Sequence, residues 1–94
     1  PGYAVMTQSG YTDTWNIRQG PFDPGYTCCQ DEDLSNDDPA LDGRIDLVFS
    51  SLPPDATYLP IKADRVGIRK QDKTASGLWP SDHAGVVTTI KFRR

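Results

Sequence analysis

The chain has 94 residues, with 10 Lys and Arg, 13 Asp and Glu and a formal net charge of -3. This acidic balance argues against strong unaided binding to nucleic acid, because phosphate contacts need clustered basic side chains. Its apolar fraction of 36% and its eight Pro and eight Gly indicate a loop-rich domain or, as we expect, a piece of a larger one. No apolar run approaches the roughly 18–20 residues of a membrane span, and no signal peptide is visible at the N-terminus.

Residues 3–16 predict a short helix in which Val5, Met6 and Trp15 share an apolar side. Gly10 interrupts that helix at a cost of about 1 kcal/mol relative to Ala. Alternatively, Gly10 ends the helix and residues 11–17 lead outward as a loop or short strand. Both interpretations agree that the chain begins with one short helix.

Residues 18–43 are rich in Gly, Pro, Asp, Asn and Ser and predict a long loop. A loop of this length usually serves function or lies against another surface. We interpret its acidic stretch, residues 31–42, as solvated, since a calcium-binding loop needs a Gly at the sixth position and a Glu at the twelfth. The acidic residues are Asp31, Glu32, Asp33, Asp37, Asp38 and Asp42.

Cys28 and Cys29 are adjacent and are the only cysteines. Neighbouring side chains diverge in extended backbone, which disfavours a disulfide between them. Zinc sites use spaced cysteines and a second ligand pair. We therefore expect two buried thiols that pack as small hydrophobic groups, and the pair says little about the redox compartment.

Three strands are predicted in the second half of the chain. Residues 44–51 alternate apolar and polar side chains with a period of two and end before Pro53. A second strand covers residues 61–70, a loop covers 72–80, and a last strand covers 85–92. These strands would form a narrow sheet with two open edges, so we expect a preceding part of the same domain to pair one edge.

His83, the only histidine, follows Ser81 and Asp82 just before the last predicted strand. Its ordinary pKa near 6.5 lets it donate, accept or carry charge near neutral pH. Asp46 lies inside a predicted strand, where aspartate is disfavoured. Either that face of the strand is wet and His83 is an ordinary loop residue, or Asp46 accepts a hydrogen bond from His83. In the second case Asp46 orients the ring, raises its pKa and presents a cationic N–H to a phosphate.

Two segments carry a family resemblance: residues 44–49, RIDLVF, and residues 78–87, LWPSDHAGVV. They resemble the end of the endonuclease/exonuclease/phosphatase family, which includes pancreatic deoxyribonuclease, neutral sphingomyelinases and inositol polyphosphate phosphatases. Residues 10–15 and 26–30 also look like the preceding region of bacterial members. The resemblance implies an α+β fold over residues 1–94, as the C-terminal part of a four-layer α/β sandwich. It would contain about three antiparallel strands, one short N-terminal helix and a long loop.

The resemblance also implies residue roles. His83 matches the histidine that hydrogen-bonds the scissile phosphate and stabilises the transition state, and Ser81 lies with it on the substrate side. Asp46 matches the carboxylate that orients that histidine. Asp82 matches the aspartate close to the divalent metal, Mg²⁺ or Mn²⁺, and to the attacking water. The implied reaction is metal-assisted hydrolysis of a phosphoester, with phosphodiesters favoured.

Several family features have no counterpart here: the metal-binding Glu, an Asn, a second catalytic His and the Gly-Asp-x-Asn motif. We expect them in an N-terminal part of the same domain, so this chain alone should be inactive. The substrate stays open among nucleic acid, lipid and small-molecule phosphates, although the acidity of residues 18–43 favours a smaller phosphoester over DNA. Trp79 can stack on a substrate ring or pack beneath the last strand.

Two other interpretations remain. The chain can be a non-catalytic binding or assembly module of the same family, in which Asp46 faces solvent and His83 has an ordinary pKa. It can also be an unrelated structural domain. The cellular compartment stays open.

Overall fold

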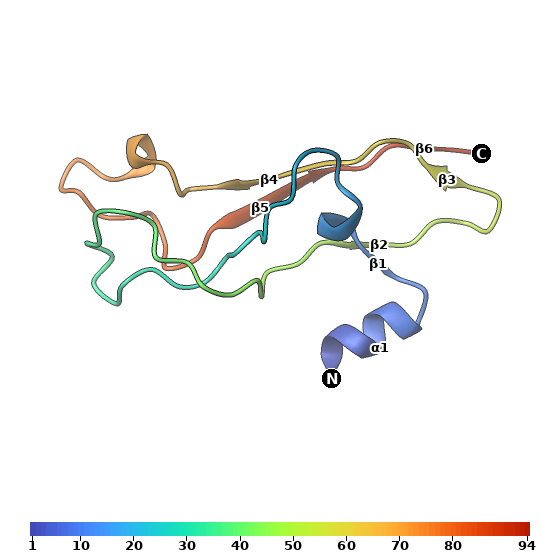
Figure 1. Ribbon diagram of the computed structural model, residues 1–94, viewed down its shortest axis with the longest axis horizontal. Coiled ribbons are helices and arrows are strands. Elements are labelled where there is room, and N and C mark those ends of the chain that lie inside the picture. Colours follow the sequence, from blue (N-terminus) through green and yellow to red (C-terminus); the bar gives the residue numbers. More distant parts are fainter. The chain divides into compact units, whose positions relative to one another are not determined.

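The computed structural model describes all 94 residues as a small α+β fold (Figure 1). The strands are short and pair in twos: β1 with β2, β3 with β6 and β4 with β5. No helix is long and apolar enough to span a bilayer. The elements are α1 (Gly2–Gln8), β1 (Thr12–Asp13), the 3-10 helix η1 (Thr14–Ile17), β2 (Phe49–Ser50), β3 (Thr57–Tyr58), β4 (Lys62–Val66), the 3-10 helix η2 (Lys70–Asp72), β5 (Gly85–Thr89) and β6 (Phe92–Arg93).

The chain divides into two compact units. The first unit contains residues 1–21, 47–63 and 88–94, and the second contains residues 22–46 and 64–87. All of the candidate site residues belong to the second unit.

Helix α1 ends at Gln8 with Ser9 as its C-cap, and Gly10 turns the chain directly after it, so the interpretation in which Gly10 terminates the helix holds. Gly10 has φ of +91°, a left-handed conformation that glycine adopts without steric cost. Its N–H donates to the carbonyl of Thr7 at 3.2 Å, and the N–H of Tyr11 donates to the carbonyl of Met6 at 3.1 Å. These two bonds form a Schellman motif, which satisfies carbonyls that the helix end leaves free.

Trp15 lies in η1 and belongs to the core of the first unit, where it is 9% exposed. Asp13 caps η1 by accepting a hydrogen bond from the N–H of Trp15 at 3.2 Å and another from the hydroxyl of Tyr3 at 3.0 Å. Thr14 donates to the carbonyl of Val48 through both its N–H, at 3.0 Å, and its hydroxyl, at 2.8 Å. The buried polar side chains of Asp13 and Thr14 are thus paired, as their burial requires.

In the second unit, loop segments rather than a sheet surround a small core. Trp79 is 1% exposed and Ala84 is 3% exposed. The indole N–H of Trp79 donates to the carbonyl of Asn36 at 2.7 Å, and its backbone N–H donates to the carbonyl of Leu34 at 2.9 Å. Trp79 therefore packs against the acidic loop, and the alternative in which it stacks on a substrate ring is wrong.

The long loop over residues 18–43 is confirmed, and the acidic side chains of residues 31–42 are exposed. The three predicted strands are shorter than expected. Of residues 44–51 only Phe49 and Ser50 form a strand, β2. The strand predicted over residues 61–70 ends at Val66, because Gly67 turns the chain with φ of +80°.

The last predicted strand, residues 85–92, divides into β5 and β6. β6 pairs with β3, which the sequence pattern did not predict, and Tyr58 lies opposite Phe92. Strands of two residues carry no detectable alternation, so the period-two pattern could not indicate β3.

Candidate functional site

An irregular segment, residues 27–30, holds together the loops that carry Asp46 and His83. On one side, Cys28 and Gly43 exchange two backbone hydrogen bonds, each of 2.9 Å. On the other side, the N–H of Ala84 donates to the carbonyl of Thr27 at 2.8 Å, and Cys28 forms an antiparallel bridge with His83. The segment thus joins two stretches that lie far apart in the chain.

The side chain of Thr27 positions Asp46. Thr27 is fully buried, and its hydroxyl oxygen accepts hydrogen bonds from the N–H groups of Ile45 at 3.0 Å and Asp46 at 3.1 Å. Asp46 was predicted inside a strand, and this prediction is wrong. The backbone N–H groups at positions 45 and 46 bond to a side chain instead of a neighbouring strand, so no ladder forms there.

Asp46 and His83 form a short hydrogen bond, with 2.6 Å between Oδ2 of Asp46 and Nδ1 of His83. This contact was expected from the sequence, although the two residues lie 37 positions apart. The side chain of His83 is 34% exposed and that of Asp46 is 45% exposed. The imidazole is therefore held at one nitrogen and remains accessible to solvent, just before β5 begins.

The contact shifts the pKa values of both residues. The hydrogen bond that His83 donates to Asp46 raises the pKa of His83 above 6.5, and the charges of Asp46 and Asp82 act in the same direction against a smaller effect of desolvation. Desolvation works to raise the pKa of Asp46. The hydrogen bond with His83 and the hydroxyl of Thr27 together outweigh it, so the pKa falls below 3.8. Each group favours the charged form of the other.

Ser81 and Asp82 form an exposed turn beside His83. The hydroxyl of Ser81 accepts a hydrogen bond from the N–H of His83 at 3.0 Å and lies 3.4 Å from Oδ1 of Asp82. The carbonyl of Asp82 accepts from the N–H of Gln30 at 2.8 Å. The side chains of Ser81 and Asp82 are exposed to solvent. The hydrogen bonds of this turn hold the backbone of His83 in position.

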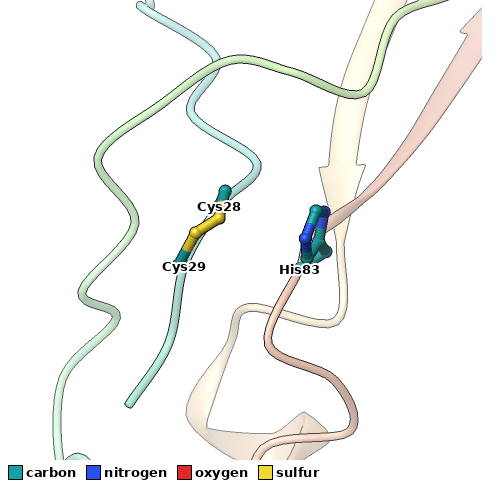
Figure 2. Close-up of side chains that lie close together, drawn as sticks. All are labelled: Cys28, Cys29 and His83. Atoms are coloured by element: carbon teal, nitrogen blue, oxygen red, sulfur yellow. A yellow bond between two sulfur atoms is a disulfide. The ribbon is translucent and has the colours of Figure 1, made fainter. Parts of the chain in front are cut away.

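Cys28 and Cys29 form a disulfide across a cis peptide bond, so the prediction of two free thiols is wrong. That prediction assumed an extended trans backbone, in which neighbouring side chains diverge. Cys28 is 8% exposed and Cys29 is exposed. Figure 2 shows the disulfide and the imidazole of His83 close together. The two sulfur atoms and a ring nitrogen of His83 all lie within 4.8 Å of one another.

The residues of this chain do not assemble a Mg²⁺ or Mn²⁺ site. These ions prefer oxygen ligands, and Asp82 does not belong to any group of three or more candidate metal ligands. The one group of three candidate metal ligands contains sulfur and nitrogen: Cys28, Cys29 and His83. No step of a reaction is therefore derived through Mg²⁺ or Mn²⁺.

Sequence reasoning missed Thr27 and the two cysteines as parts of the site. No local pattern marks Thr27, because a buried threonine is ordinary in any core. The only feature of the two cysteines visible in the sequence is that they are adjacent. This adjacency was taken to disfavour both a disulfide and a metal site.

No protein-family model, curated protein sequence or solved structure matches this chain. The comparisons thus neither support nor oppose the family resemblance, which rests on residues 44–49 and 78–87.

Proposed function

We propose that the chain is the part of a metal-dependent phosphoesterase that supplies the Asp46–His83 pair of the active site. The supporting observation is the 2.6 Å contact between Nδ1 of His83 and Oδ2 of Asp46, in a half-exposed imidazole with a raised pKa. With Nδ1 bonded to Asp46, Nε2–H is the group that can approach a substrate.

The pair can stabilise negative charge that develops on a phosphoryl oxygen. A protonated imidazole donates a charge-assisted hydrogen bond, which is stronger than a neutral one. Asp46 keeps the ring charged and oriented, so little reorganisation is needed during the reaction. Asp82 and Ser81 lie beside His83 on the same exposed turn, where Ser81 would contact the substrate and Asp82 would face the metal.

A complete site needs more groups than this chain supplies. We propose that Mg²⁺ or Mn²⁺ and its remaining ligands are brought by an N-terminal part of the same domain, which completes a four-layer α/β sandwich. The exposed apolar side chains support a further covering surface: Phe22 is 92% exposed, Val5 61% and Ile45 60%. Two-stranded sheets are also marginal without further strands or packing.

The substrate class in this proposal is a phosphodiester smaller than duplex DNA. The exposed acidic loop, residues 31–42, belongs to the same unit as His83. Its carboxylates would repel the closely spaced phosphates of a nucleic-acid backbone. A lipid or small-molecule phosphoester carries fewer charges and meets less repulsion.

Turnover measurements in an intact domain that carries this segment test the catalytic role. His83→Ala should lower kcat by about 10²–10⁴, the usual contribution of a positioned proton donor. Asp46→Asn should lower it less, because the ring is still held in place. An unchanged kcat in a folded His83→Ala domain would remove His83 from the mechanism.

The 94-residue chain allows a second test. It should show negligible hydrolysis of a phosphodiester with Mg²⁺, because several electrostatic partners are absent together and each typically contributes about 10²–10³ in rate. Dimethyl phosphate should nevertheless shift the NMR signals of the His83 imidazole at pH 6. Robust hydrolysis would contradict the division of the active site, and unshifted imidazole signals would contradict the phosphate contact.

A non-catalytic binding or assembly module is the second candidate. It is favoured by the same exposed apolar side chains and by the lack of an oxygen-rich metal site in this chain. Under this alternative, the Asp46–His83 pair is a structural contact, and His83→Ala in the intact domain weakens folding or partner binding without changing a reaction rate.

A further inference from the structure

We propose that Cys28, Cys29 and His83 form a Zn²⁺ site when the disulfide between the two cysteines is reduced. The three residues are the one group in the chain whose side chains offer three candidate metal-ligand atoms close together. The inference does not rest on phosphoesterase activity, because it concerns the binding of a metal ion and is measured as such.

The ligand atoms are near the spacing that zinc requires. Zinc–sulfur bonds of about 2.3 Å and zinc–nitrogen bonds of about 2.0–2.1 Å at tetrahedral angles place two sulfurs about 3.8 Å apart and sulfur and nitrogen about 3.6 Å apart. The two Sγ atoms and the His83 nitrogen lie within 4.8 Å of one another. Reduction removes the S–S bond, so the sulfurs are free to separate toward this distance.

The donor set selects the metal. Thiolates and imidazole suit zinc and exclude Mg²⁺ and Ca²⁺, which take oxygen ligands. Three protein ligands leave a fourth tetrahedral position for water, as in zinc sites with an open position. Cys29 is exposed and His83 is half-exposed, so water can reach that position.

Asp46 supplies the outer partner that such a histidine usually has. Metal-bound histidines almost always donate their second ring N–H to a carboxylate or carbonyl, which fixes the ring and its tautomer. Nδ1 of His83 contacts Oδ2 of Asp46 at 2.6 Å, which leaves Nε2 for the metal. The backbone bridge between Cys28 and His83 holds the two sides of the site together before any ion binds.

The disulfide is converted to the zinc site in two steps, reduction and metal binding. A dithiol reductant transfers two electrons and two protons to the Cys28–Cys29 bond, becomes a disulfide itself and leaves two cysteine thiols. Zn²⁺ then binds the two sulfurs and releases their two protons, while His83 binds through a lone pair. A small-molecule disulfide reverses the switch: it takes up the two electrons, and two protons from solvent, to become two thiols, while the two sulfurs form the Cys28–Cys29 bond and release Zn²⁺.

Zinc titration of the 94-residue chain tests the site, with a chromophoric chelator as competitor and a trialkylphosphine as the reductant. The reduced chain should bind one Zn²⁺, and the oxidised chain should bind at least tenfold more weakly. Cys29→Ser and His83→Ala should each weaken binding at least tenfold, and Asp46→Asn by about 10–100-fold, the usual effect of an outer partner. Equal affinity of the oxidised and reduced chains would overturn the proposal.

Glu32→Gln is the matched control, because it removes an exposed carboxylate from the neighbouring loop and should leave zinc affinity unchanged. A second measurement avoids dependence on how the variants fold. Zn²⁺ should slow alkylation of the reduced wild-type cysteines by iodoacetamide at least tenfold, as followed by mass spectrometry. Alkylation at the same rate with and without Zn²⁺, or loss of affinity in Glu32→Gln equal to that in His83→Ala, would overturn the site.

Discussion

At the scale of single residues, the pKa of His83 reports directly on its contact with Asp46. We expect Asp46→Asn to lower the pKa of His83 toward 6.5, because the hydrogen bond and charge of Asp46 are what raise it. NMR titration of the imidazole measures this change. Asp82→Asn should lower the pKa by a smaller amount, since Asp82 acts through its charge alone. A larger effect of Asp82→Asn would show that the hydrogen bond does not dominate.

The same pair makes stability depend on pH. The raised pKa of His83 gives stabilisation that is complete below 6.5 and lost as pH rises through the raised value. The lowered pKa of Asp46 gives stabilisation that is present above 3.8 and lost as pH falls through the lowered value. The difference in unfolding free energy between wild type and Asp46→Asn should therefore be largest between pH 3.8 and 6.5.

Urea denaturation at a series of pH values measures this difference. The Asp55→Asn variant serves as the control because it removes an exposed carboxylate whose ion-pair partner is Arg94 and not His83. A wild-type advantage over Asp46→Asn that stays constant from acid to alkaline pH would contradict an ion pair between Asp46 and His83.

At the scale of elements, the segment over residues 27–30 should depend on the hydroxyl of Thr27. Thr27→Val keeps the volume of the side chain but leaves the N–H groups of Ile45 and Asp46 without their acceptor. We expect a loss of about 1–3 kcal/mol in the free energy of unfolding for unsatisfied buried donors. Thr57→Val, at an exposed position of β3, should change stability by less than about 0.5 kcal/mol. Similar effects of the two substitutions would contradict this role of Thr27.

The acidic loop should depend on Trp79 in a comparable way. Trp79→Phe retains an aromatic ring but loses the 2.7 Å hydrogen bond to the carbonyl of Asn36. We expect faster proteolytic cleavage within residues 31–38 and a stability loss of about 0.5–1.5 kcal/mol, the net value of one hydrogen bond. Unchanged cleavage in Trp79→Phe would show that this bond does not hold the loop.

At the scale of the whole molecule, the apolar surface exceeds the apolar core. Five hydrophobic residues are buried: Trp15, Cys28, Ile61, Trp79 and Ala84. Twelve large hydrophobic side chains are exposed: Tyr3, Val5, Tyr11, Ile17, Phe22, Tyr26, Ile45, Val66, Leu78, Val87, Ile90 and Phe92. Scattered exposed apolar residues are normal, but these side chains leave apolar surface accessible to solvent.

The isolated chain should therefore bind an apolar fluorescent dye in its native state. Phe22→Ser should lower the dye fluorescence with less than about 0.5 kcal/mol change in stability, because Phe22 is 92% exposed and contributes little to the core. Fluorescence titration and urea denaturation of the same samples measure both quantities. No dye binding by the wild type would contradict an accessible apolar surface.

Properties set by a few neighbouring residues could be predicted from the sequence. Gly10 ends a helix because its backbone adopts a left-handed conformation, and residues 18–43 form loops because their composition disfavours regular hydrogen bonding. The contact of Asp46 with His83 was expected through the family resemblance and is present at 2.6 Å. The catalytic roles of these two residues and of Ser81 and Asp82 stay predictions.

The tertiary structure decided what depends on residues distant in the chain. Alternation over residues 44–51 indicated a strand, yet a strand needs a partner, and the N–H of Asp46 bonds instead to Thr27, 19 positions away. Adjacency of the cysteines argued against both a disulfide and a zinc site. The backbone conformation at Cys28 and Cys29 joins their sulfurs, and folding brings His83 beside them. Local propensities act over a few residues, whereas hydrogen-bond partners that are distant in the chain are set by the packing of the whole unit.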